Sequence, residues 1–454
     1  MAITITKQPT QPNMANNDLL FVVSSNKTTE PQYQYVVDVF ESGSATLIQR
    51  IKQQPNPSGL GVFNMGNILT TQMDSDKVWK TLAFATSSEC NKLFQVKFGE
   101  TFASSSTSTP ELYDGITTAT TGSPAKVGDE YYTITDGLVD YPDAVAYNFA
   151  SSSYYVAESA SVYNTFNHQV VLSNAPTTQS INEDEYLTLS MYNGNMMFPA
   201  SDIVAQDIFY VQIQWYNDAG SVIQNDSLTN VSANGGAPRT SVGQLWNAVA
   251  GQQTAGSRLI HVGLGVQNLI DIGYIPPSGW AYYTTTFYGQ GDDGLENNDG
   301  VWGTMRFNKA TGECSYNGVR FAWKNEFGVW DYYTFTLQSN ASNNIERISY
   351  KQSFVPYNTA DTTPTYDTTR RGTKQIVNKV NRVRTANSDW LTQEEADWLR
   401  ELFFSTDVYI QEGTSFYPVA ITDATLNEKT NPRTQKVFQY GINFELANNK
   451  RNRR

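Results

Sequence analysis

The sequence predicts a mainly β protein made of several β-sandwich or barrel modules, followed by a C-terminal α+β unit. Aromatic residues make up 13% of the 454 residues, with 27 Tyr and 22 Phe, and these side chains suit pleated strands. Short apolar runs alternate with turn clusters along most of the chain. One segment near the C-terminus instead has helical periodicity, which indicates a helix packed on a sheet.

We interpret residues 1–72 as an N-terminal β-sandwich-like module. Alternation places Tyr33, Tyr35, Val37 and Val39 on one face of a strand. Residues 41–44 form a turn, and residues 45–51 return as the hairpin partner.

Residues 73–355 form a central β-rich region of one or two modules. Its Ser/Thr-rich segment 104–124 is too polar to pack and predicts a mobile loop. Apolar runs predict strands at 168–172, 186–191, 208–215, 259–264, 280–288, 318–323 and 330–337, with a short helix at 242–250. Residues 325–328 predict a turn between two aromatic strands, with Gly328 at positive φ.

Residues 356–369 are rich in Thr, Asp and Pro and predict a linker to the α+β unit, residues 370–454. In that unit Thr392 and Glu395 have capping-box spacing at the start of a helix. Its apolar stripe is formed by Trp398, Leu399, Leu402 and Phe403. A half-buried strand is predicted from the alternation of Phe438, Tyr440, Ile442, Phe444 and Leu446.

The net charge of −13 is unevenly distributed. From residue 370 onward there are 14 Lys+Arg and 10 Asp+Glu, so this end is basic and the rest is acidic. The acidic net charge of the chain before residue 370 argues against general nucleic-acid binding. The basic tail is either a solvated chain end or a docking surface for an acidic neighbour or another copy. No apolar run of membrane-spanning length and no signal peptide are evident, so we expect synthesis in the cytoplasm.

Residues for catalysis or metal binding are scarce. The two histidines, His168 and His261, lie in apolar strand-like runs and are interpreted as structural. The two cysteines, Cys90 and Cys314, are expected to be reduced and buried. The acidic segment 291–300 does not match the EF-hand register, so a solvated loop is favoured over a weak Ca²⁺ site. Glu183 and Asp184 are an uninformative carboxylate pair. The sequence predicts a protein that is not an enzyme and has no cofactor.

Three sets of segments together resemble structural proteins of tailed bacteriophages, notably phages of Bacteroidetes and marine hosts. They are residues 33–39 with 55–63, residues 320–335, and residues 388–399 with 417–421 and 444–448. The resemblance implies a virion tail component, of the hub, ring or adaptor type. Such a protein is made in the host cytoplasm and contacts further copies of itself and other tail or connector proteins. No catalytic residues carry over from the resemblance.

The candidate interface combines the aromatic hairpin with four arginines, although the hairpin also fits a simple core hairpin. Its residues are Trp323, Phe327, Trp330, Tyr332, Tyr333, Arg370, Arg371, Arg453 and Arg454. The Tyr and Trp surplus supports an alternative, a carbohydrate-binding or depolymerising protein that recognises a host receptor. A cell-surface adhesin domain is disfavoured by the missing signal peptide.

Overall fold

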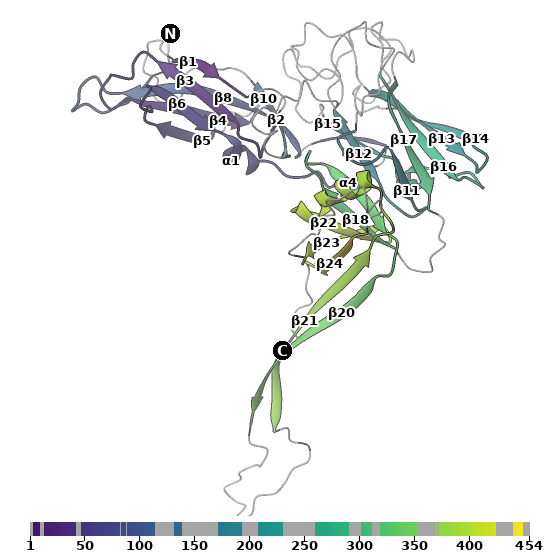
Figure 1. Ribbon diagram of the computed structural model, residues 1–454. Helices are drawn as coiled ribbons and strands as arrows, with labels where there is room; N and C mark the ends of the chain where they lie inside the picture. The colour runs from purple at the N-terminus through teal and green to yellow at the C-terminus, as the bar shows by residue number, and fades with distance from the viewer. Residues whose placement is uncertain are drawn as a thin grey trace, which may run out of the picture. The chain divides into compact units, whose positions relative to one another are not determined.

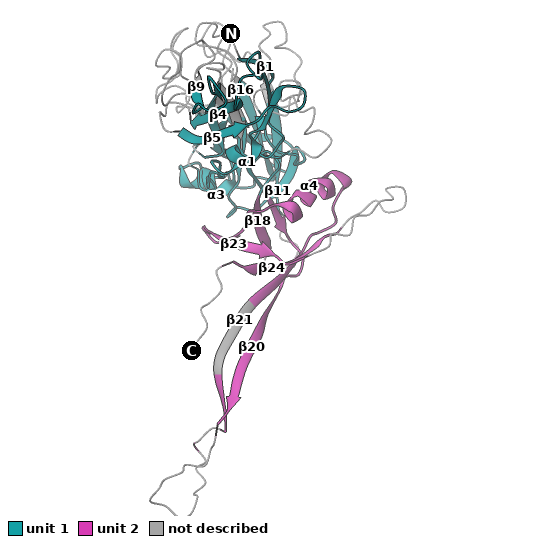
Figure 2. Ribbon diagram, turned by 90° about the vertical axis from the view of Figure 1, so that its left-hand side faces the viewer, with its two compact units in different colours: residues 1–310, 324–331 teal, residues 311–323, 332–454 magenta. Residues whose placement is uncertain are grey.

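The computed structural model confirms a mainly β chain with a small C-terminal helix on a sheet. It describes residues 3–9, 13–41, 47–81, 83–87, 89–113, 131–138, 171–192, 208–229, 259–289, 301–310, 318–352, 369, 372–423 and 439–447. The chain divides into two compact units (Figure 2). Unit 1 comprises Met1–Ala310 and Lys324–Asp331, and unit 2 comprises Thr311–Trp323 and Tyr332–Arg454.

Unit 1 begins with a β-sandwich (Figure 1). The first sheet has the order β1 (Ile3–Lys7), β3 (Leu20–Ser25), β6 (Leu60–Asn64), and the short helix α1 (Gly66–Thr70) follows β6. The second sheet has the order β2 (Asn13–Met14), β10 (Tyr131–Thr135), β8 (Asn91–Phe102), β4 (Gln34–Glu41), β5 (Leu47–Gln53), with β9 (Glu111–Tyr113) also paired to β8.

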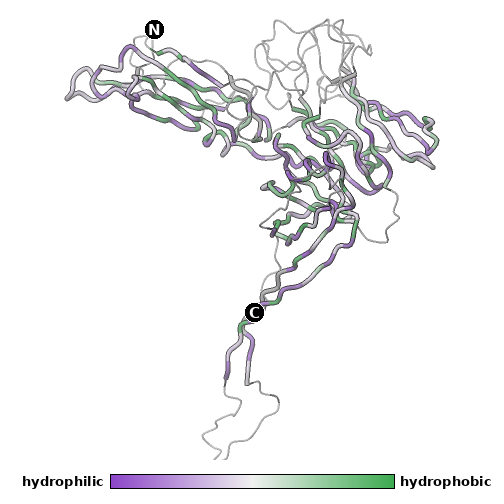
Figure 3. The backbone as a smooth tube through the Cα atoms, in the orientation of Figure 1, coloured by the Kyte–Doolittle hydropathy of each residue, from purple (hydrophilic) through white to green (hydrophobic). Residues whose placement is uncertain are grey.

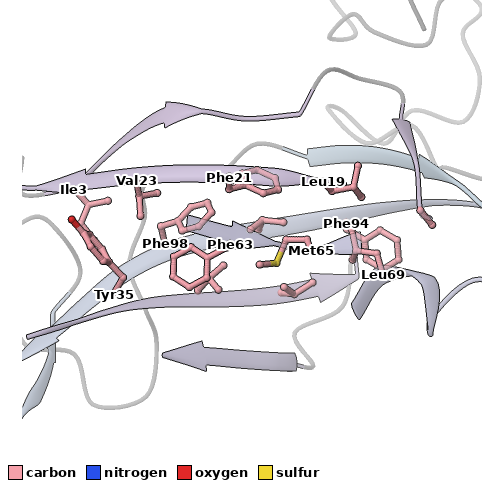
Figure 4. Close-up of a cluster of buried hydrophobic side chains, with 14 of the residues drawn as sticks. Ile3, Leu19, Phe21, Val23, Tyr35, Phe63, Met65, Leu69, Phe94 and Phe98 are labelled. Carbon is pink, nitrogen blue, oxygen red and sulfur yellow. The ribbon is translucent and has the colours of Figure 1, made fainter. Parts of the chain in front are cut away.

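The sandwich core lies between these sheets, where alternate side chains point inward (Figure 4). Phe21 and Phe63 from the first sheet pack against Phe98 of the second, with ring centroids 5.5 and 5.9 Å apart. The predicted face of β4 is confirmed, because Tyr33, Tyr35, Val37 and Val39 all belong to this cluster.

The module extends beyond the boundary that we predicted at residue 72. Strand β8 pairs with β4 along eight residues, and β10 pairs with β8, so the same sheet continues to residue 135. The predicted loop 104–124 is also partly strand, since Glu111–Tyr113 form β9 and the rest of the segment from residue 114 lies outside the described residues. Pairing between distant segments, which no local pattern reveals, accounts for the first difference, and β9 arises because the chain turns back beside the end of β8.

The remainder of unit 1 contains two more sheets. One has the order β11 (Thr178–Ile181), β17 (Val301–Lys309), β16 (Tyr282–Gly289), β13 (Ile208–Tyr216), β14 (Val222–Thr229). The other has the order β12 (Thr188–Tyr192), β15 (Leu259–Gly263), β7 (Phe84–Thr86), and helix α3 (Val266–Asp271) follows β15. Because β7 comes from the chain between β6 and β8, these sheets and the sandwich are interleaved in sequence.

Buried aromatic side chains form the core of the larger of these two sheets. The rings of Trp215 and Tyr283 lie 4.7 Å apart, and Phe307 stacks on Tyr283 at 5.1 Å. Tyr282 is half-buried while its neighbour Tyr283 is fully buried, because successive side chains of a strand face opposite sides of the sheet.

Unit 2 is one antiparallel sheet of seven strands with a helix packed against it (Figure 1). The order is β19 (Trp330–Phe335), β18 (Val319–Lys324), β22 (Val408–Glu412), β23 (Ser415–Ile421), β24 (Gly441–Leu446), β21 (Thr373–Asn387), β20 (Asn340–Lys351). Tyr440, Ile442 and Phe444 are buried, which confirms the predicted alternation for residues 440–444, whereas Leu446 is half-buried.

Helix α4 (Gln393–Phe404) begins at the predicted capping box. Thr392 Oγ1 accepts a hydrogen bond from the Glu395 N–H, and the Glu395 carboxylate accepts one from the Thr392 N–H at 2.8 Å. The helix buries Trp398, Leu399 and Leu402, and the Trp398 ring lies 5.1 Å from that of Trp323.

The predicted linker is wrong as a domain boundary. Residues 356–368 lie outside the described residues, but β20 and β21, the strands on either side of them, pair with each other along all of β20 and belong to unit 2. The segment therefore joins the two strands of a hairpin. The C-terminal unit begins near residue 311 instead of 370. Polar composition alone does not distinguish a hairpin loop from a linker.

Other predictions fall outside the described residues, so the structure says nothing of them. They are the helix at 242–250, the acidic segment 291–300, His168, Cys314 and Phe438.

Candidate interaction surface

The aromatic hairpin that we predicted as an interface is largely core. Trp323, Phe327, Trp330 and Tyr332 are each at most 4% exposed. Side chains this deeply buried within one chain are not available to a second subunit, so the prediction is wrong for these four residues. Large apolar rings contribute as much to a core as to an interface, and only burial separates the two.

Tyr333 is the half-buried member of this group. Its ring packs edge-on against those of Phe335, at 5.3 Å, and Trp398, at 6.0 Å. Burial, followed by the negative charges of Glu395 and Asp389, raises the pKa of Tyr333 well above that of an exposed tyrosine. The hydroxyl therefore stays neutral throughout the physiological range.

The tip of the hairpin, Lys324–Asp331, belongs to unit 1. Asn325 Oδ1 accepts hydrogen bonds from the N–H groups of Phe327, at 3.0 Å, and Val329, at 3.2 Å, which closes the predicted turn. Gly328 has φ +79°, as predicted, and an added Cβ would lie 1.4 Å from the Asp136 carbonyl oxygen. Only glycine, which has no Cβ, allows the backbones at positions 328 and 136 to approach this closely.

Charged and polar contacts hold the tip in unit 1. Lys324 forms an ion pair with the buried carboxylate of Asp136. The Trp330 indole donates to the Asp76 carbonyl oxygen at 2.7 Å, and the thiol of Cys90 donates to the Gly328 carbonyl oxygen at 3.1 Å. Cys90 is buried, as predicted, and burial raises the pKa of its thiol. These groups have structural partners.

A buried Ser–His–Asp set lies close to this tip in unit 1. His261 Nδ1 is 2.8 Å from Ser190 Oγ, and its Nε2 is 3.4 Å from Asp76 Oδ2. Ser87 also donates to Asp76, at 2.5 Å. In a hydrolytic triad the serine partners Nε2 and the carboxylate partners Nδ1, the reverse of what is seen here. Ser190 is 2% exposed and His261 is 1% exposed, so the set ties strands β12 and β15 to the chain before β7, and the structural interpretation of His261 is supported.

The second unit contains an exposed surface that sequence reasoning missed. All twelve residues of β20 are exposed. Residues 383–387 of β21 pair with β24, and residues 383–385 pair with β20 on the other side. Among the described strands, residues 345–351 and 373–380 have only each other as partners, and we call these two stretches the ribbon. Figures 1 and 2 show β20 and β21 extending past the other strands of their sheet.

Basic and apolar side chains are displayed on this part of the sheet. Strands β20 and β21 together contain six basic residues and one acidic residue, Glu346. The exposed basic residues are Arg347, Lys351, Lys374 and Arg382. Ile345, Ile348 and Tyr350 are 45%, 59% and 40% exposed. Hydrophilic and hydrophobic residues are interspersed along both strands (Figure 3).

A sequence signal for these strands existed but was weak. β-Branched residues recur in Ile376, Val377, Val380 and Val383, separated by Asn, Lys and Arg. This composition favours a strand that is solvated on both faces, a pattern without the strict alternation of a half-buried strand. The four arginines that we predicted at the interface, Arg370, Arg371, Arg453 and Arg454, lie outside the described residues.

In the described part of the chain, the remaining candidate groups do not form a catalytic or metal-binding site. Glu183 accepts hydrogen bonds from Lys309, at 2.6 Å, and from the Trp280 indole, at 3.3 Å, and the Lys309 contact holds the pKa of its carboxyl below the usual value. Within the described ranges, no group of three or more His, Cys, Asp or Glu is arranged to hold a metal ion. None of the described helices is both long and apolar enough to cross a membrane.

Comparisons with known proteins add little. No family model matches the chain, and no curated protein matches it. Among solved structures, trypsin-activated alpha-2-macroglobulin from Escherichia coli aligns with 85% of this chain at 9% identity and a TM-score of 0.18. The chain spans 22% of the length of that structure. A likeness this weak supports no conclusion about fold or function.

Proposed function

We propose that this protein is a structural component of a phage virion, in the tail, which acts through contacts between subunits. The tail location rests on the sequence resemblance. The subunit contacts rest on the exposed ribbon of unit 2.

The ribbon is the observation that carries the proposal. A two-stranded hairpin in water is marginally stable at best, because each strand has one hydrogen-bonded neighbour and no core to pack against. Exposed sheet edges are also sites where another chain binds. A ribbon of this length, carrying exposed isoleucines, is therefore expected to be covered by a partner in the working assembly.

The buried polar groups of unit 1 are compatible with this role. Asp76, His261, Asp136 and Cys90 all have partners within the chain that hold strands and turns together. Such groups favour a single rigid conformation of a building block.

The test is to locate the protein in purified particles of the phage that encodes it. We expect its peptides in the particles by mass spectrometry, at a fixed copy number, and density in the tail by cryo-electron microscopy. Absence from particles, with the protein remaining in the infected-cell lysate, would contradict the proposal. A glycan array and an assay for release of reducing sugar address the alternative, a carbohydrate-binding or depolymerising receptor protein. A specific signal in either assay would favour that alternative.

A further inference from the structure

We infer that the basic ribbon of one copy binds the acidic unit 1 of a second copy, head to tail. This inference rests on the proposed assembly function and names the partner of the ribbon.

The ribbon and unit 1 have opposite formal charge. The ribbon carries a formal charge of +3, from Arg347, Lys351, Lys374 and Lys379 against Glu346. Unit 1 contains 30 Asp+Glu and 14 Lys+Arg, a formal charge of −16. Opposite charges speed encounter and help to select the partner, and a second copy of this chain always supplies an acidic unit 1.

The charge distribution also predicts the symmetry. Two ribbons brought together across a two-fold axis would place like charges against each other, and like charges facing each other are unfavourable. The ribbon and unit 1 are different surfaces, so the contact between them is heterologous. Heterologous contacts produce closed rings where the rotation closes, and filaments where it does not.

Apolar side chains give the contact a centre. Ile348 and Tyr350 are exposed at alternate positions on one face of β20, and Tyr350 lies opposite Lys374 in the register. The exposed side chain of Lys374 lies beside Tyr350 on this face, and Arg347 and Lys351 are exposed on the other face of β20 together with Ile345, so each face combines apolar and basic side chains. An apolar centre with a charged rim is the usual make-up of a protein interface.

Nucleic acid is the competing partner for a basic two-stranded ribbon. The net charge of −16 on unit 1 of the same chain would repel the phosphate backbone, which favours the protein partner.

The experiment compares three full-length proteins by sedimentation velocity over a concentration series, at low and at high salt. They are the natural chain, the ribbon variant R347E/K351E/K374E, and the control variant K7E/K52E/K77E. The control residues are exposed lysines of unit 1, and both variants change the net charge by the same amount. We expect the natural chain and the control to associate, the control at least as tightly as the natural chain because its substitutions make unit 1 more acidic. Salt should weaken the association, and the ribbon variant should associate at least tenfold more weakly than the natural chain.

Cross-linking with mass spectrometry on mixed isotope-labelled copies then maps the contact. Cross-links from Lys351 or Lys374 of one copy to unit 1 of another support the inference. Equal association of the ribbon variant and the natural chain, or no inter-copy cross-link from the ribbon at the highest concentration, overturns it. A gel shift with double-stranded DNA that the ribbon variant loses and the control keeps would assign the ribbon to nucleic acid instead. None of these results tests whether the protein is present in the virion. Only its absence from purified particles would contradict the proposed function itself.

Discussion

Two consecutive hairpins in this chain have opposite surroundings. Strands β18 and β19 are buried along most of their lengths, whereas every residue of β20 is exposed. Six of the twelve residues in β18 and β19 are aromatic, against one of twelve in β20, Tyr350. The burial of large rings is a main source of folding free energy, so the first hairpin is held by its own chain.

The comparison shows that antiparallel pairing by itself says little about what a hairpin does. The first hairpin has its turn fixed by backbone contacts at Gly328 and by the ion pair between Lys324 and Asp136. In the second hairpin every side chain of β20 is exposed, so none of them is buried in an apolar layer. The first is therefore a determinant of stability, and the second is a surface available for binding.

The largest expected effect is at Gly328. Gly328→Ala places a Cβ against the Asp136 carbonyl at positive φ, so we expect a loss of about 3–5 kcal/mol in the free energy of unfolding, measured by urea denaturation. Gly413→Ala is the matched control. Gly413 has φ +59° with no atom within 4 Å of the added Cβ, so only the backbone cost of about 1 kcal/mol remains. Equal losses in the two variants would show that the close approach is not the constraint.

Trp330→Phe tests whether the buried indole N–H supports the first hairpin. The substitution leaves the Asp76 carbonyl without this donor and shortens the ring that packs on Trp79. We expect a loss of about 2–3 kcal/mol in unfolding free energy, by denaturant titration. Trp390→Phe, at a side chain that is 64% exposed, should change stability by less than about 0.5 kcal/mol. A neutral Trp330→Phe variant would refute the role of this hydrogen bond.

Stability above pH 10 should depend on Tyr333. Its pKa is raised in the folded chain, while an unfolded tyrosine titrates near pH 10, so the folded protein binds the proton more tightly. The unfolding free energy contributed by this group is constant below about pH 10. It then falls by about 1.4 kcal/mol per pH unit as pH rises toward the folded pKa. Tyr333→Phe should lessen the slope measured by urea titrations at stepped alkaline pH. An unchanged slope would mean that Tyr333 ionises equally in both states.

The smallest effect is expected in the ribbon. Ile348 is 59% exposed, so Ile348→Thr should change the unfolding free energy by less than about 0.5 kcal/mol. Ile410→Thr, at a fully buried position of the same sheet, should cost about 2 kcal/mol or more. If thermal unfolding shows similar losses for both, Ile348 is packed within the free chain and the contrast between the two hairpins fails.

The sequence was sufficient for the features that depend on local chemistry. The mainly β class, the strand face of Tyr33 and Tyr35, the capping box at Thr392 and the positive φ of Gly328 were all predicted correctly. Each follows from the period of apolar residues, from a cap or from a turn, which neighbouring residues determine among themselves.

Only the tertiary structure decided which surfaces are covered. Trp323 and Trp330 are residue types that are enriched at interfaces, yet they lie in the core, while every residue of the polar strand β20 is exposed. The pairing of β7 with β15, and of β8 with β4, joins segments far apart in the chain. Burial and strand partners depend on where distant segments meet, and a one-dimensional pattern does not contain that information.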